Sequence, residues 1–122
     1  MRLGPVLATV ACAAGVTVSA CSLISTPPTA RSLANKIGCT DFSPEQQAGS
    51  YFHDIGGCYL NSSSYLTIFT FTSNDVRNQW LEIARQGGVS PALIVSGNLW
   101  AVRSDPAGVS AVQKILGGQI GD

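Results

Sequence analysis

Four residues of the kinds that bind metal ions or transfer protons lie close together in the middle of the chain: Cys39, His53, Asp54 and Cys58. Thiolates, imidazoles and carboxylates are the protein ligands of zinc, but this spacing contains no C-x-x-C or H-x-x-x-H pair. Outside the cytoplasm, two cysteines more commonly form a disulfide. We therefore predict a structural Cys39–Cys58 disulfide and expect no metal or other cofactor, with a metal site as the alternative.

His53 is the only histidine, so any mechanism based on a Ser-His-Asp or Cys-His arrangement must use it. Neighbouring Asp54 does not indicate a triad, because triads are recognised by their geometry. The sequence contains no G-x-S-x-G, H-E-x-x-H or S-x-x-K motif and no glycine-rich phosphate loop. We therefore predict that the chain has no catalytic residues and is not an enzyme. A small secreted hydrolase that uses His53 is the alternative.

The aromatic residues Tyr51 and Phe52 precede His53 in a polar stretch that the predicted disulfide would enclose. Two aromatic rings beside a histidine make Tyr51, Phe52 and His53 a candidate contact patch. Packing of the rings over an edge of the sheet is the favoured role. A strand tryptophan in so short a chain is more often a core residue, and we predict this for Trp100.

The N-terminus has the three parts of a secretory signal in residues 1–20. Arg2 provides a positive charge, residues 3–18 are uncharged and apolar, and small residues follow. The motif Val18-Ser19-Ala20-Cys21 resembles the lipobox of bacterial lipoprotein precursors, in which the cysteine receives the lipid. Val18-Ser19-Ala20 also satisfies the rule of general signal peptidases, so ordinary secretion is an alternative, as is an uncleaved membrane anchor.

The cysteine count favours the lipoprotein interpretation. The chain has four cysteines, and Cys12 would be lost with the signal. Ordinary secretion would leave an odd cysteine, whereas lipidation of Cys21 leaves two that can pair. Residues 21–30 then form the lipidated cysteine and an extended tether, because Pro27 and Pro28 disfavour a helix.

The composition limits the partners of the mature chain. Without Arg2, six basic residues remain against seven acidic ones, and they are scattered: Arg31, Lys36, Arg77, Arg85, Arg103 and Lys114. A basic run or stripe is absent from the sequence, so we expect no nucleic-acid partner, and the lipid must supply the membrane attachment. Residues 31–122 are sufficient for a single compact domain and too few for two.

The first half of this domain is predicted to contain a helix, a loop and a hairpin. Residues 31–37 form the helix, with Ser32 as a possible cap, and the polar, turn-rich residues 40–54 form the loop. Residues 58–60 and 65–71 are the two predicted strands of a hairpin, and the turn residues 61–64 connect them. The second strand is rich in aromatic and β-branched side chains.

The second half contains two helices and a second hairpin. The first helix follows a capping box that starts at Thr72, and Gly87-Gly88 ends it. Residues 93–95 and 99–103 form the hairpin. The last helix has Asp105 as its cap and Pro106 at its first position. Residues at helical spacing predict the buried faces of these two helices: Val76, Trp80, Ile83 and Ala84, then Val109, Val112, Ile115 and Leu116.

These elements predict an α+β fold with the order strand, strand, helix, repeated once after a short N-terminal helix. We expect the two hairpins to form a four-stranded antiparallel sheet with both of the later helices on one face. Such a sheet would bury the two tryptophans and Phe69 or Phe71.

Beyond the lipobox, the chain resembles the small lipoproteins of actinobacteria in size, tether, cysteine pair and hairpin–helix segments. The resemblance implies a location on the outer face of the cell membrane and implies no known activity. We expect a non-catalytic, membrane-tethered binding or interaction module whose partner is an envelope protein or a small ligand. A structural or accessory envelope lipoprotein is the alternative.

Overall fold

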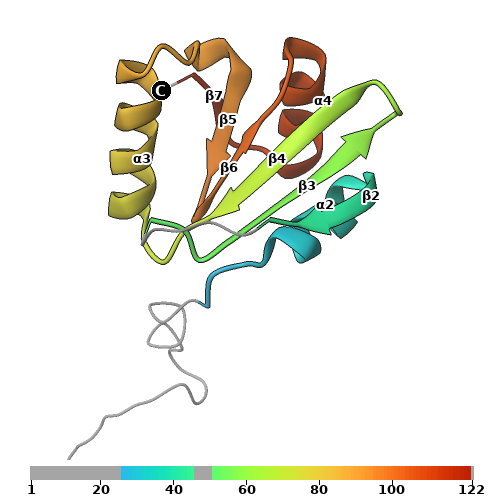
Figure 1. Ribbon diagram of the computed structural model, residues 1–122, viewed down its shortest axis with the longest axis horizontal. Helices are drawn as coiled ribbons and strands as arrows, with labels where there is room; N and C mark the ends of the chain where they lie inside the picture. Colours follow the sequence, from blue (N-terminus) through green and yellow to red (C-terminus); the bar gives the residue numbers. More distant parts are fainter. Residues whose placement is uncertain (1–25, 46–50, 122) are drawn as a thin grey trace, which may run out of the picture.

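The structure is a computed structural model that describes residues 26–45 and 51–121. The described residues form three layers, with helices on both faces of one antiparallel sheet (Figure 1). In chain order the elements are α2 (Ala30–Ile37), β2 (Thr40–Pro44), β3 (Asp54–Leu60), β4 (Ser64–Thr70), α3 (Asn74–Gln86), the 3-10 turn η1 (Pro91–Leu93), β5 (Ile94–Gly97), β6 (Trp100–Arg103), α4 (Pro106–Leu116) and β7 (Gln119–Ile120).

The predicted α+β class is confirmed, but the prediction of a four-stranded sheet is wrong. The sheet of the described residues has six strands in the order β2-β3-β4-β6-β5-β7. The two predicted hairpins, β3–β4 and β5–β6, lie side by side through the antiparallel pairing of β4 with β6. Two short strands that we did not predict, β2 and β7, extend the sheet at its edges.

Tight turns hold both hairpins in register. Asn61 and Ser62, between β3 and β4, have φ values of 58° and 63°, a left-handed conformation that asparagine adopts more readily than most residues. Asn98 and Leu99 connect β5 to β6, and Leu99 also has a positive φ of 66°. Short hairpin loops with positive φ match the twist of the flanking strands, so these turns fix which side chains share a face.

The prediction of a continuous loop over residues 40–54 is wrong, because residues 40–44 form strand β2. Its one aromatic side chain, Phe42, lies against Gly56 of β3, where an added Cβ would come within 2.4 Å of the ring. Arg31 of α2 covers this ring, with its guanidinium carbon 4.7 Å from the ring centroid. The residues around Phe42 are polar, so the sequence predicts a loop here. The strand forms because the Phe42 ring fits against a glycine of the neighbouring strand.

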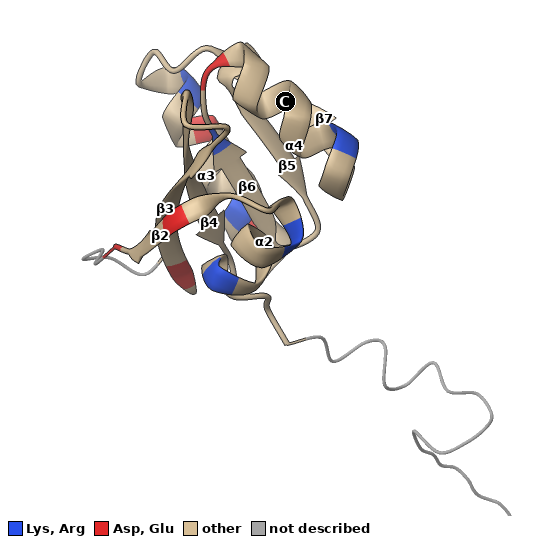
Figure 2. Ribbon diagram, turned by 90° about the vertical axis from the view of Figure 1, so that its right-hand side faces the viewer, with Lys and Arg blue, Asp and Glu red and all other residues tan. Residues whose placement is uncertain are grey.

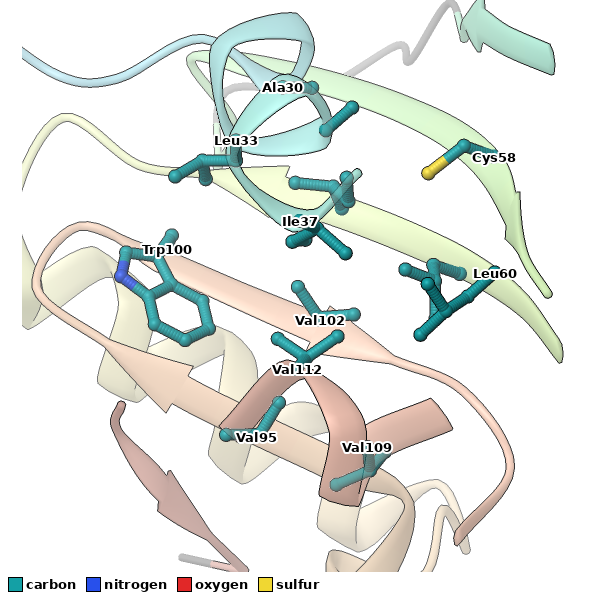
Figure 3. Packing of buried hydrophobic residues seen from close by; sticks show 13 residues of the cluster. Ala30, Leu33, Ile37, Cys58, Leu60, Val95, Trp100, Val102, Val109 and Val112 are labelled. Atoms are coloured by element: carbon teal, nitrogen blue, oxygen red, sulfur yellow. The ribbon is translucent and has the colours of Figure 1, made fainter. Parts of the chain in front are cut away.

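Helices α2 and α4 cover one face of the sheet, which we call the closed face (Figure 3). From α2, Leu33 and Ile37 point toward the strands, and from α4, Val109 and Val112 do the same. They meet the inward side chains of the strands: Cys58, Leu60, Leu66, Ile68, Val95, Trp100 and Val102. Trp100 is therefore a core residue, as predicted.

Helix α3 lies on the opposite face, so the expectation that both later helices share a face is wrong. Its Trp80 packs against Phe69, with ring centroids 4.5 Å apart, and against Phe71, 5.9 Å away. Both phenylalanines belong to the cluster on the α3 side together with Leu81, Ile94 and Ala101. The helix follows β4 directly, and its position is set by where these two rings project.

The predicted buried faces of α3 and α4 are correct except at one isoleucine in each helix. Val76, Trp80 and Ala84 pack against the α3-side cluster, but Ile83 is 48% exposed. In α4, Ile115 is 49% exposed. Both isoleucines lie one position away from the residues that meet the sheet, and at 100° per residue one position is enough to leave the contact.

In two of the three helices, the N-terminal cap is a different residue from the one that the sequence predicts. Thr29 caps α2 and forms a reciprocal capping box with Ser32, which we predicted as the cap itself. Ser73 caps α3 by accepting a hydrogen bond from the Val76 backbone at 3.1 Å, in place of Thr72. Asp105 caps α4 as predicted, with Pro106 at the first turn.

Candidate functional site

The predicted site residues are not gathered in one place. The lipobox and Cys21 lie outside the described residues. Cys39 and Cys58 form a disulfide, as predicted, which joins the end of α2 to the middle of β3. Cys58 is fully buried within the closed-face core, so the bridge serves the fold.

His53 and Asp54 line one small depression of about 120 Å³, but they make different hydrogen bonds. His53 is exposed, and its backbone N–H donates to the Thr70 carbonyl at 2.8 Å. The Asp54 carboxylate accepts the backbone N–H of Ala30 at 2.8 Å and that of Ile55 at 3.1 Å, which fixes the start of α2 to the start of β3. Among the described residues, no group of three His, Cys, Asp or Glu side chains could hold a metal ion.

The residues of the predicted contact patch differ in burial: one packs against the core and two lie on the surface. Phe52 packs on the α3-side cluster, with its ring centroid 5.2 Å from Phe69 and 6.1 Å from Trp80. Tyr51 is exposed, with its centroid 6.4 Å from that of Phe52. The favoured role, packing of the ring over the sheet, therefore applies to Phe52, and only Tyr51 and His53 remain on the surface.

A different set of side chains, three exposed and one half-buried, shares one surface, because α3 covers only part of its face of the sheet. In Figure 1 the helix lies along one flank, and the β3–β4 hairpin extends away from it. The cross-strand partners Tyr59 and Tyr65, and the partners Thr67 and Arg103, lie on this uncovered part. We call these four residues the open face.

Tyr65 lies at the centre of the open face and is held in place from two sides. Its hydroxyl donates to a Glu45 carboxylate oxygen at 3.0 Å, and an added Cβ on Gly57 would collide with the phenol. The Tyr59 ring meets it edge to face, with the centroids 5.0 Å apart. Partial burial, followed by the hydrogen bond and the negative charge of Glu45, raises the pKa of Tyr65.

Arg103 is the only cation of the open face, and its guanidinium has no hydrogen-bond or ion-pair partner among the described residues. The nearby Asp105 carboxylate already accepts hydrogen bonds from the Gly108 backbone at 2.7 Å and from the Ser64 hydroxyl at 2.9 Å. These two bonds, the backbone bond first, lower the pKa of Asp105. The carboxylate is thus engaged in capping α4, and the guanidinium is available to a ligand.

A broad depression of about 630 Å³ runs along this surface beside η1 and the start of α4. Its lining includes Tyr65, Thr67, Phe69 and Arg103. It offers ring faces, hydroxyl groups and one unpaired guanidinium to a ligand. Ser104 and Asp105 complete the polar side of the lining, and such a surface can bind a ligand through its side chains.

Sequence reasoning did not find the open face, although a signal was present. Residues 65–71 alternate between side chains of the closed face, such as Leu66 and Ile68, and side chains of the other face, such as Tyr65 and Thr67. Strand alternation alone separates these two sets. What it does not reveal is that α3 leaves Tyr65 and Thr67 uncovered.

No protein-family model, curated protein or solved structure matches this chain. None of the helices formed by the described residues has the length and the apolar character needed to span a bilayer. The charged residues are spread over several elements, and none of the described helices or strands carries a basic stripe (Figure 2).

Proposed function

We propose that the protein is an extracytoplasmic lipoprotein, attached to the outer face of the cell membrane through a lipid on Cys21. Its folded domain is a non-catalytic binding module, and the open face is the surface that holds the partner. The observation that carries the binding part is the unpaired Arg103, which lines one depression with the exposed Tyr65 on the part of the face that α3 does not cover. The exposed Tyr59 ring packs against Tyr65.

The direction of the chain supports this arrangement. The described chain reaches the domain at Thr26, and Ala30 is hydrogen-bonded to Asp54 at the first residue of β3. Tyr59 lies five residues further along β3, about 17 Å away at the usual rise of a strand. A tether that leaves at the start of β3 holds the opposite end of the hairpin, with Tyr59 and Tyr65, away from the membrane (Figure 1).

The anchoring part is tested by substitution of the predicted lipidation site. Cys21→Ser should move the protein from the membrane fraction to the culture supernatant, or leave it as an uncleaved precursor. A lipid contributes ~0.8 kcal/mol per buried methylene, and no basic cluster in the mature sequence replaces it. The matched control is Cys12→Ser, which should stay with the membrane. Intact mass should show a diacylglyceryl group on a chain that begins at Cys21, and an unmodified chain beginning there would refute the anchor.

The binding part is tested with the secreted Cys21→Ser chain and isolated cell-envelope fragments. The double substitution Tyr59→Ser, Arg103→Gln should abolish sedimentation with the fragments. The matched control, Ile115→Ser, Lys114→Gln, removes one exposed apolar side chain and one cation from α4, on the other side of the sheet. It should sediment like the parent chain. Equal sedimentation of both variants would instead favour the structural or accessory role.

A further inference from the structure

We infer that the ligand of the open face is an acidic saccharide, whose sugar ring packs on Tyr59 and Tyr65 and whose carboxylate binds Arg103. This inference rests on the proposed function, since it names the class of ligand that the same surface holds. Three features of the surface lead to it: what its backbone can still bind, how its two rings are presented, and which charge it leaves unpaired.

The backbone of the open face is not available to a ligand. Strand β4 lies between β3 and β6 and pairs with β3 along its whole length and with β6 over residues 67–70. Beyond that pairing, the Tyr65 carbonyl accepts a hydrogen bond from the Ser104 hydroxyl at 2.8 Å. An extended peptide binds a sheet most readily by adding a strand at a free edge, which β4 does not have. Recognition at this surface therefore depends on side chains alone.

Those side chains combine ring surface with hydroxyl groups. Tyr59 and Tyr65 are 44% and 43% exposed, and their edge-to-face packing leaves both rings partly accessible to one ligand. A tyrosine ring has an apolar face and a polar tip, which suits a ligand that is itself apolar on one side and hydroxylated at its rim. A pyranose ring has this character, with C–H groups on its faces and hydroxyl groups around it.

The unpaired charge of the open face specifies an acidic sugar over a neutral one. The Arg103 guanidinium presents several N–H donors in a planar fork that matches a carboxylate in two-point contact. Thr67 is its direct cross-strand partner and adds a hydroxyl beside the fork. Asp105 accepts the hydrogen bonds of the α4 cap and Glu45 accepts that of Tyr65, and neither carboxylate forms an ion pair with Arg103. One cation that lines the same depression as Tyr65 is complementary to one acid group on a sugar that packs on this ring and on its neighbour Tyr59.

The test is calorimetric titration of the secreted Cys21→Ser chain with an oligogalacturonate and with its methyl ester. The ester keeps the sugar rings and removes the negative charges. We expect the acid to bind, the ester to bind roughly tenfold or more weakly, and Arg103→Gln to weaken binding of the acid by a similar factor. The matched control, Lys114→Gln, removes a positive charge from α4 and should bind like the parent chain.

A glutamate oligopeptide provides the charge without the sugar and separates this inference from the proposed function. If the peptide binds more tightly than the oligogalacturonate and Arg103→Gln weakens that binding, the saccharide is wrong and the binding module stands. If the acid and its methyl ester bind equally, or if the acid does not bind, the inference is overturned. Sedimentation with envelope fragments then decides the proposed function separately.

Loss of binding through misfolding is excluded by two further measurements. Arg103 is exposed, so Arg103→Gln should unfold at the same urea concentration as the parent chain. Tyr59→Leu keeps an apolar side chain but removes the ring and the hydroxyl. It should weaken binding of the acid and of the ester by the same factor, because the charge contact remains. If Tyr59→Leu has no effect on either ligand, the rings play no part and the saccharide is overturned.

Discussion

Adjacent residues of β4 belong to two different environments. Leu66 and Ile68 are fully buried on the closed face, beneath the helices α2 and α4. Tyr65 and Thr67, on the other face of the same strand, remain accessible because α3 reaches only as far as Phe69 and Phe71. The closed face is mainly aliphatic, with Trp100 among its core residues, and carries the disulfide, whereas the open face is made of rings, hydroxyl groups and one cation.

This difference indicates that one face of the sheet stabilises the fold and that the other is available for binding. Aliphatic side chains that pack in a dry interior contribute most of the free energy of folding and offer nothing to a partner. Polar and aromatic side chains at an uncovered surface contribute little to folding and remain free to bind. Substitutions on the two faces should therefore separate stability from binding.

The largest effect is expected from Leu66→Ala on the closed face. It should lower the free energy of unfolding by roughly 2–5 kcal/mol, because it leaves a cavity in a fully buried site. Thr67→Ala, at the next residue on the other face, should change the free energy of unfolding by less than about 1 kcal/mol. Urea unfolding of both variants measures the difference, and equal effects would remove the distinction between the faces.

The disulfide should have the next largest effect. The double substitution Cys39→Ala, Cys58→Ala should lower the free energy of unfolding by ~3 kcal/mol, since the bridge closes a loop whose ends lie 19 positions apart. In the secreted Cys21→Ser chain, thiol alkylation should find no reactive cysteine until the protein is unfolded and reduced. Two alkylatable thiols in the native chain, or thiols released by a chelator, would refute the bridge and restore the metal alternative.

A smaller effect is expected at the cap of α3, which among the described helices is the one on the side of the open face. Ser73→Ala should lower the free energy of unfolding by about 1 kcal/mol, because it removes the hydrogen bond to the Val76 N–H. Thr72→Ala is the control, since Thr72 is exposed and does not cap the helix. Thermal unfolding compares the two, and the reverse order would return the cap to the position that the sequence predicts.

The smallest effect on stability, but a clear spectroscopic one, is expected at Glu45. The pKa of Tyr65 is raised above its ordinary value of 10.0 by burial and then by Glu45, so Glu45→Gln should lower it toward that value. The protonated phenol donates this hydrogen bond. Its contribution to stability is therefore complete below pH 10 and is lost as the pH rises through the raised pKa. Titration of the Tyr65 ring signals by NMR measures the shift, and an unchanged pKa would contradict the hydrogen bond between Tyr65 and Glu45.

The sequence predicts the local elements of this fold better than their arrangement. Both hairpins and all three helices follow from strand alternation, helical spacing and capping residues, each of which acts within a few positions. Strand β2 escapes prediction because its pairing depends on Phe42 fitting over Gly56, a contact between segments that are far apart in sequence. The terminal pair Gln119–Ile120 is too short to show a period at all.

The side on which α3 packs is also beyond local reasoning. Phe69 and Phe71 lie on one face of β4, and Leu66 and Ile68 lie on the other, so both faces of the strand are apolar in sequence. Trp80 could pack on either set. Because Trp80 packs on the phenylalanines, α3 leaves Tyr59, Tyr65, Thr67 and Arg103 uncovered. The sequence does not contain this information, so it predicts a contact patch at residues 51–53 and not on the open face.

The central claim, that the open face is the binding surface, is tested most directly by NMR of the isotopically labelled, secreted Cys21→Ser chain. Addition of a solubilised extract of the cell-envelope fragments should shift the backbone amide signals of Tyr59, Tyr65, Thr67 and Arg103 and leave those of α2 and α4 unchanged. Shifts that cluster on α2 and α4, or the absence of any shift at saturating extract, would contradict the account.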